Sequence, residues 1–277
     1  MKRTDVQVFM LCNRNVPYLI DNEIITPLQC GTSVVDNNVC QLKDNTGNNI
    51  SHLNEFYLEN TGVYWIWKNI NDAKYKGQMQ YRRQFANLQY YDFDKIFQDH
   101  DIIVAEPLNL PSTFNDPKCT LEFHYKVAHN KRDLDVLEDI INEKYPEYQD
   151  DYIKYIKNGQ NILYSCGFIM KSEDYDKYCQ ILFDIIEEYR KRMNLHNILD
   201  VKNYVINCYK NNKRSKLLPL SAVDLFLLSV RRVDRKTVAI PVSPIWTNNC
   251  ALTLIGVRAY TESVFAIKRR LECFLLP

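Results

Sequence analysis

A polar turn with an aromatic block after it, and a short segment that contains two adjacent arginines, carry most of the chemistry that this sequence could perform. The turn Asp44-Asn45-Thr46-Gly47-Asn48-Asn49-Ile50-Ser51 leads into an aromatic block, Tyr64-Trp65-Ile66-Trp67-Lys68-Asn69, and Gln80-Tyr81-Arg82-Arg83-Gln84-Phe85 follows shortly after. Each guanidinium offers a planar fork of donors with a permanent charge, which suits phosphate oxygens. Held beside aromatic faces, the two arginines could bind a nucleotide diphosphate.

The composition limits where such chemistry can take place. The chain has 277 residues, of which 46% are hydrophobic and 25% charged, and its formal net charge is +1. The length suits one large α/β domain, or one domain with a small appendage. A net charge this small creates no general attraction for nucleic acid or an anionic membrane. We therefore expect no nucleic-acid partner, and any anion site must be local.

The cysteines and the apolar runs indicate a cytoplasmic protein. None of the nine cysteines has C-x-x-C spacing or forms a Cys/His pattern typical of zinc sites. Scattered thiols of this kind are expected to be reduced. The N-terminal apolar run is too short for a signal peptide, and no apolar stretch approaches the ~18 residues of a membrane span. The tail 266–276 mixes basic and apolar residues; a docked terminal helix is favoured, with contact to a partner or membrane face as the alternative.

Periodicity predicts strands that alternate with helices. Buried strands are expected at 6–11, 75–83, 101–105, 162–170 and 238–242, with strand fragments at Ile24-Ile25 and Val34-Val35. Helices are expected from Ser51 through the aromatic block, at 133–144, from Ser172 to about 189, at about 200–210 and at 221–232. The stretch 107–128 has the composition of a loop. This alternation predicts an α/β fold with a mostly parallel sheet flanked by helices.

The familiar glycine-rich phosphate loops are absent from the sequence. It contains only seven glycines, with neither G-x-G-x-x-G nor G-x-x-x-x-G-K-[ST]. A classical dinucleotide site and a P-loop are therefore both disfavoured. In open α/β sheets ligands lie beyond the carboxyl ends of the strands, so the turn Cys12-Asn13-Arg14-Asn15 is a candidate binding edge.

The order of the polar and aromatic blocks resembles a known family. It is similar to the capsular or exopolysaccharide biosynthesis proteins catalogued as domain of unknown function 4422, which are GT-A-like glycosyltransferases. The resemblance covers about residues 5 to 190. The matching residues are Asn45, Gly47, Asn49, Ile50, Ser51, Asn54, Tyr64, Trp65, Trp67, Lys68, Asn69, Tyr81, Arg82, Arg83, Phe85, His129, Asp133, Leu134, Tyr145, Pro146, Tyr148, Phe168, Ile169, Met170, Tyr178, Cys179, Leu182 and Phe183.

The resemblance implies a GT-A-like, Rossmann-like fold with a helical C-terminal part. Residues 1–195 would form the nucleotide-sugar-binding domain, and 196–277 a helical extension packed on it. In GT-A folds the donor lies across the carboxyl edges of the first strands. The resemblance therefore assigns donor binding to Asn49, Ser51, Asn54, Trp65, Lys68, Asn69, Gln80, Tyr81, Arg82 and Arg83. Trp65 or Trp67 could stack on the base or sugar, with core packing as the alternative.

Arginines stand where many GT-A enzymes carry Asp-x-Asp for a divalent metal. Two cations could neutralise a leaving diphosphate directly, so we expect metal-independent transfer and no bound Mn²⁺ or Mg²⁺. Asp92-Phe93-Asp94 is the Asp-x-Asp nearby, but its setting predicts a helix start, where acids are ordinary first-turn residues.

Inverting transfer also needs a base for the acceptor hydroxyl. Asp133 and His129 are the candidates from the family pattern. The structural alternatives are a helix N-cap for Asp133 and an exposed loop position for His129.

Two departures from the family pattern leave a second hypothesis open. Gln80 stands in place of His, and Asn48 in place of Asp, so a titratable group and a negative charge are lost. The first hypothesis is a transferase that moves a sugar from a nucleotide-sugar, preferably UDP-linked, to a surface or capsular glycan. The second is a catalytically silent GT-A-like module that binds a glycan or a partner protein.

Overall fold

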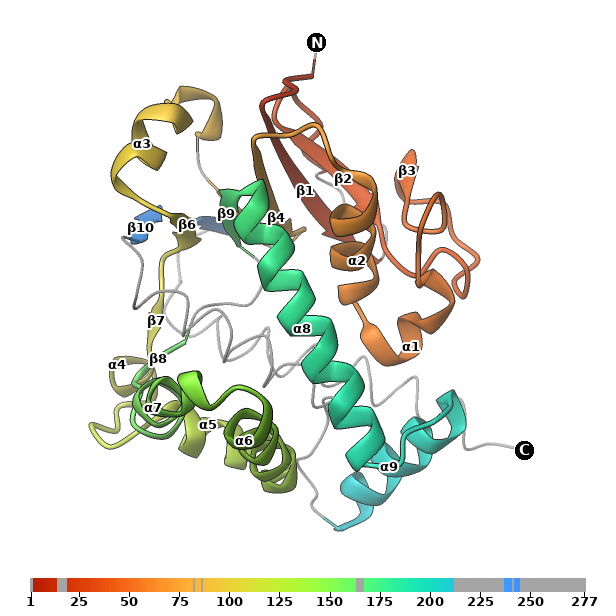
Figure 1. Ribbon diagram of the computed structural model, residues 1–277, viewed down its shortest axis with the longest axis vertical. Coiled ribbons are helices and arrows are strands. Elements are labelled where there is room, and N and C mark those ends of the chain that lie inside the picture. The colour runs from red at the N-terminus through yellow and green to blue at the C-terminus, as the bar shows by residue number, and fades with distance from the viewer. Residues whose placement is uncertain are drawn as a thin grey trace.

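The described part of the chain is built around one seven-stranded sheet. The computed structural model describes residues 2–13, 19–81, 83–85, 87–162, 167–211, 237–240 and 242–244. Within these ranges the strand order is β10-β6-β9-β4-β1-β2-β3 (Figure 1). The strands are β1 Val6–Cys12, β2 Ile25–Gln29, β3 Leu42–Lys43, β4 Tyr75–Gln80, β6 Ile102–Ala105, β9 Phe168–Lys171 and β10 Thr237–Ile240. Only β9 runs antiparallel to its neighbours β4 and β6, which confirms the predicted mostly parallel sheet.

Helices cover both faces of the sheet, because β1 is apolar on both of its sides. Phe9 and Leu11 pack with α2 and α8, whereas Val8 and Met10 belong to the cluster that contains the apolar side chains of α3. The result is a three-layer α/β/α arrangement. The helices are α1 Asn54–Tyr57, α2 Asn60–Asn69, α3 Phe93–Asp99, α4 Leu110–Phe114, α5 Leu121–Ala128, α6 Lys131–Lys144, α7 Gln149–Tyr152, α8 Ser172–Arg192 and α9 Ile198–Asn211.

The longest described helix, α8, connects the sheet with the helices beyond it. Figure 1 shows α8, in green, running from β9 past α2 towards α9, while α5, α6 and α7 lie together below the sheet. Its predicted inward stripe is confirmed, since every member is buried: Tyr175, Tyr178, Cys179, Leu182, Ile186 and Tyr189. Two-stranded pairs complete the fold, namely β5 Arg83–Phe85 with β11 Val242–Pro244 and β7 Leu108–Asn109 with β8 Asn161–Ile162.

The register of the parallel strands brings four strand ends to one edge. Cys12 at the end of β1 is paired with Gln29 at the end of β2, and Gln29 is paired in turn with Lys43 at the end of β3. On the other side of β1, Leu11 is paired with Gln80, the last residue of β4. The segments that follow these four strands therefore start from the same carboxyl edge, as expected for ligand sites of open α/β sheets.

Several local expectations were wrong. The stretch 107–128 contains α4 and α5, and the Thr120 hydroxyl caps α5 by accepting a hydrogen bond from the Phe123 amide (3.2 Å). Val34 and Val35 lie in a turn that hydrogen-bonds to the Gly31 carbonyl, and not in a strand. Neither predicted serine cap forms, because the hydroxyls of Ser51 and Ser172 bind partners outside their own helices.

The boundaries near the C-terminal half also differ from the sequence pattern. The expected strand 162–170 is divided between β8 and β9, which lie in different sheets, and the expected strand 75–83 ends at Gln80. The helix expected near 200–210 is confirmed as α9, and the strand near 238 as β10, which joins the main sheet beside β6. The expected helix at 221–232 and the tail 266–276 lie outside the described residues, so the division at residue 195 stays a prediction.

None of the helices in the described ranges is long and apolar enough to cross a membrane.

Candidate functional site

A buried carboxylate organises the carboxyl edge of the sheet. Asp44 follows β3 directly and is fully buried. Its oxygens accept hydrogen bonds from the Gly31 amide (2.7 Å), the Thr32 amide (3.1 Å) and hydroxyl (2.6 Å), and the Ser51 hydroxyl (2.6 Å). One carboxylate thus holds the segment after β2 against the segment after β3. Asp44 was not among the predicted site residues, although an acid directly after a strand in a polar turn is a usable signal.

The loop between β2 and β3 is fixed by a second buried polar side chain. Gln29 ends β2 and is fully buried. Its amide nitrogen donates to the main-chain oxygen (2.8 Å) and side-chain oxygen (2.7 Å) of Asn37. Its amide oxygen accepts from the main-chain N–H groups of Val39 (2.8 Å) and Cys40 (3.3 Å). The loop is therefore anchored along its length to the strand end.

The polar turn after Asp44 is held by the end of α2. The Asn69 side chain accepts from the Asn48 amide (3.0 Å) and donates to the Asn48 carbonyl (2.8 Å) and the Trp65 carbonyl (2.8 Å). Gly47 has φ +55, and a Cβ there would overlap the Asn69 amide group. Asn49 donates to the Gly47 carbonyl (3.0 Å) and accepts from the Ser51 amide (3.2 Å). The asparagines predicted to bind the donor therefore shape this turn.

The tryptophans of the aromatic block pack mainly with protein groups. Trp65 is buried; its indole N–H donates to the Thr46 carbonyl (2.9 Å), and its ring meets Phe9 edge-on at 6.1 Å. The half-buried Trp67 stacks on Phe183 with ring centroids 5.7 Å apart, and the Lys68 ammonium lies 3.1 Å from its centroid. Core packing, the alternative left open by the sequence, accounts for Trp65.

Asn54 serves the turn between α1 and α2. Its amide nitrogen donates to the Leu58 carbonyl (2.5 Å) and to the Thr61 hydroxyl (3.0 Å). Together with Ser51, which Asp44 holds, it belongs to the framework of the edge. Both residues were predicted to contact the donor directly, and that contact stays a prediction.

The end of β4 carries the predicted diphosphate-binding residues. The Gln80 amide donates to the Glu59 carboxylate (3.4 Å), and Tyr81 is buried, with its main-chain N–H donating to the Leu11 carbonyl (3.3 Å). The main chain of Arg83 begins β5. Arg82 and the side chain of Arg83 lie outside the described residues, so their binding of a diphosphate stays a prediction. Glu59 was not selected from the sequence; only its place before an aromatic helix could have indicated it.

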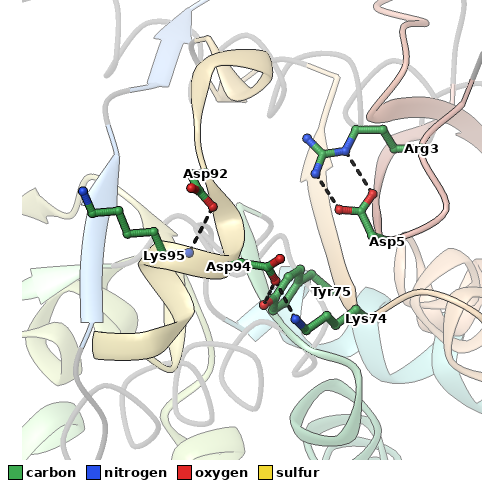
Figure 2. A network of polar contacts seen from close by, with 7 residues as sticks. All are labelled: Arg3, Asp5, Lys74, Tyr75, Asp92, Asp94 and Lys95. Atoms are coloured by element: carbon green, nitrogen blue, oxygen red, sulfur yellow. Dashed lines mark hydrogen bonds and ion pairs between the residues drawn. The ribbon is translucent and has the colours of Figure 1, made fainter.

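The Asp-x-Asp sequence lies at the opposite edge of the sheet. Figure 2 shows Asp92 capping α3 by accepting from the Lys95 main-chain N–H (3.1 Å), which confirms the predicted helix start. Asp94 is bound by the Lys74 ammonium (2.5 Å) and the Tyr75 hydroxyl (2.7 Å), and these partners hold the pKa of its carboxyl below the usual range. Tyr75 starts β4 and Gln80 ends it, and a rise of about 3.3 Å per residue separates the two by about 16 Å, so Asp94 is bound at the far end of this strand.

Asp133 lies at the centre of a tyrosine cage. Its carboxylate is 1% exposed and accepts hydrogen bonds from the hydroxyls of Tyr125 in α5 (3.3 Å), Tyr189 in α8 (2.8 Å) and Tyr204 in α9. Burial raises the pKa of Asp133, and the three hydroxyls oppose that rise. The expectation that Asp133 is an N-cap was wrong, because Asn130 caps α6. A base must reach its substrate, so this geometry favours a structural role joining four helices over the predicted catalytic one.

His129 packs beside the same cage. It is 7% exposed, and its ring lies against Tyr125 with centroids 4.4 Å apart. The alternative of an exposed loop histidine was therefore wrong. Its predicted catalytic role stays a prediction. Among the described residues, no three His, Cys, Asp or Glu side chains are grouped as metal ligands.

Comparison with known proteins identifies the family of the chain and a similar fold. Residues 7–207 match the family described as Domain of unknown function (DUF4422). The apo structure of WbbM, a bifunctional glycosyltransferase, has a similar fold, with a TM-score of 0.66 and 23% sequence identity. The match covers 88% of this chain and 46% of the WbbM chain, so this chain spans less than half of that protein. No curated protein sequence matches the chain significantly.

The Asp44 arrangement predicts a large effect from a nearly isosteric substitution. Asp44→Asn removes the charge and one acceptor from a buried carboxylate that binds four donors, so we expect it to lower the free energy of unfolding by about 2 kcal/mol. Urea denaturation measures this loss. The control is Asp36→Asn, because Asp36 is an exposed residue of the loop between β2 and β3. It should leave the urea midpoint unchanged. Equal midpoints for the two variants would contradict the organising role of Asp44.

The tyrosine cage predicts a pH dependence with a definite sign. A raised pKa means that folded Asp133 binds its proton more tightly than unfolded Asp133, so its contribution to stability grows as pH falls. The stability of the wild type relative to Asp133→Asn should therefore increase as the pH falls from neutral towards about 4, the pKa of an unfolded aspartate. Urea denaturation of both proteins across this range tests the slope. A decrease towards acid would mean that the hydroxyls outweigh burial and depress the pKa.

Proposed function

The chain belongs to the DUF4422 family, and from this premise we propose that it is a glycosyltransferase that uses a nucleotide-sugar donor. The observation that carries the proposal is the convergence of the carboxyl ends of β1, β2, β3 and β4 on one edge of the sheet, in a fold that a glycosyltransferase shares. The preferred donor is UDP-linked, and the acceptor is a surface or capsular glycan. Transfer would take place in the cytoplasm, with peripheral contact to the membrane face.

In this proposal the strand that ends at Gln80 supplies the phosphate contacts. Arg82 and Arg83 neutralise the leaving diphosphate, with Tyr81 fixing the direction of the chain before them. Two guanidinium groups supply the charge that a divalent ion supplies in other sites, so transfer is metal-independent. The position of Asp92 and Asp94 at the far edge supports this, because it separates that acidic pair from the proposed diphosphate position.

The polar turn supplies the nucleotide side of the site. Asp44 and Asn69 hold this turn and the loop after β2 in one arrangement before any ligand arrives. Preorganised donors and acceptors bind without a further loss of conformational freedom. Asn49, which is half-buried, contacts the ribose or base, while Ser51 and Asn54 keep the edge in shape.

A silent module that binds a glycan or a partner protein is the second candidate. The observation in its favour is Gln80, an amide at the end of β4 that cannot change its protonation state near neutral pH. In that case donor binding could persist without transfer. Binding and turnover therefore have to be measured separately.

Donor binding should be detectable as thermal stabilisation. We expect one or more members of a panel of UDP-sugars to raise the melting temperature, because a ligand that binds only the folded state stabilises it. In the presence of an acceptor, turnover of the bound UDP-sugar should release UDP, and this release should persist in EDTA. Stabilisation without release on any acceptor would favour the silent module, and loss of release in EDTA would refute metal independence.

The arginines provide the matched test of the diphosphate contact. Arg82→Ala with Arg83→Ala should abolish stabilisation by UDP-sugars while leaving the melting temperature of the unliganded protein unchanged. The control is Lys74→Ala with Lys95→Ala, which removes two cations from the opposite edge of the sheet. UDP-sugars should still stabilise this variant. Undiminished stabilisation of the double arginine variant would remove the arginines from the proposed site.

A further inference from the structure

The turn between α1 and α2 holds an unusual backbone conformation. Leu58 has φ 52 and ψ −131, a region that residues with a side chain rarely occupy. Its carbonyl accepts hydrogen bonds from the Asn54 side chain (2.5 Å) and the Thr61 hydroxyl (3.1 Å), which keep the turn in place. Strain of this kind persists only where surrounding contacts impose it, and it is concentrated at functional sites.

The consequence of this turn is the position of the next residue, Glu59. Glu59 directly precedes α2, whose first turn packs against Leu11 at the end of β1 and Leu28 and Cys30 at the end of β2. One of its carboxylate oxygens accepts a hydrogen bond from the Gln80 amide (3.4 Å), and its carbonyl accepts from the Cys30 thiol (3.9 Å). Both Glu59 and Gln80 are half-buried. A carboxylate is thus held at the carboxyl edge, next to the residue that precedes Tyr81-Arg82-Arg83.

Glu59 differs from the other carboxylates at this edge. Asp44 is fully buried. Glu106 follows β6 at the same edge but is exposed. Glu59 combines partial burial, which strengthens a hydrogen bond to a ligand, with access for that ligand.

The charge of Glu59 indicates which part of a donor it faces. A carboxylate beside a diphosphate would be disfavoured by like-charge repulsion. The sugar of a nucleotide-sugar is neutral and rich in hydroxyl donors, and hydrogen bonds from such donors to a carboxylate are strong. We propose that Glu59, supported by Gln80, binds hydroxyl groups of the donor sugar and so contributes to the choice of sugar. This inference rests on the glycosyltransferase function proposed above.

A comparison of two ligands tests this contact without any acceptor. The dissociation constants of UDP and of the UDP-sugar that the wild type binds best are measured by calorimetry. Glu59→Gln should weaken binding of the UDP-sugar by about tenfold or more, since it removes a charged acceptor. Binding of UDP alone should stay within about twofold, because the nucleotide contacts are unchanged. Glu59→Asp, which keeps the charge on a shorter side chain, should give an intermediate loss.

The controls separate a sugar contact from a general disturbance of the edge. Glu106→Gln should leave both dissociation constants unchanged, and thermal denaturation should show that each variant is folded. An equal loss of affinity for UDP and the UDP-sugar, or no loss for either, would overturn the role of Glu59 while leaving the proposed function standing. A wild-type protein that binds neither UDP nor any UDP-sugar would overturn the proposed function, and this inference with it.

Discussion

The carboxylate of Asp44 is the interaction on which the rest of the candidate site depends. Parallel strands end with main-chain groups that no further strand pairs, and the segments after them must satisfy these groups in another way. Asp44 meets this need for two segments at once, through the amides of Gly31 and Thr32 and the hydroxyls of Thr32 and Ser51. Burial makes these hydrogen bonds strong, and it makes each of them costly to leave unmade.

The residues around this centre form a framework in which each side chain fixes a neighbouring main chain. Gln29 anchors the loop between β2 and β3, Asn69 holds the turn at Asn48, and Asn54 holds the turn at Leu58. Side-chain amides can fix a main-chain segment in this way because each carries both hydrogen-bond donors and an acceptor. A polar motif rich in asparagine therefore supports this edge of the sheet, and in the proposed site Glu59 is the side chain that binds the donor sugar.

The helices beyond the sheet are joined by a comparable polar centre. Asp133 in α6 accepts hydrogen bonds from tyrosine hydroxyls of α5, α8 and α9, so one buried acid links four helices. The described fold is shared with WbbM over 46% of that longer chain. The likeness concerns the fold alone, and the function of a fold depends on the particular side chains of its site.

The sequence by itself determined the class of fold, the inward stripe of α8 and the order of blocks that defines the family. Apolar periodicity is a local property, and it survives in the structure because the apolar faces must be buried. It could not reveal α5, whose cap at Thr120 lies within a stretch of loop-like composition, nor the division of 162–170 between two sheets.

Only the tertiary structure showed which polar residues of this edge are bound by other groups of the protein. Ser51, Asn54 and Trp65 have the composition of a binding motif, but their hydrogen bonds go to Asp44, Leu58 and Thr46. Asp94 has the spacing of a metal ligand, yet the register of β4 places it at the opposite edge. Other groups of the protein bind these side chains, and the type of a residue does not by itself show which partner it binds.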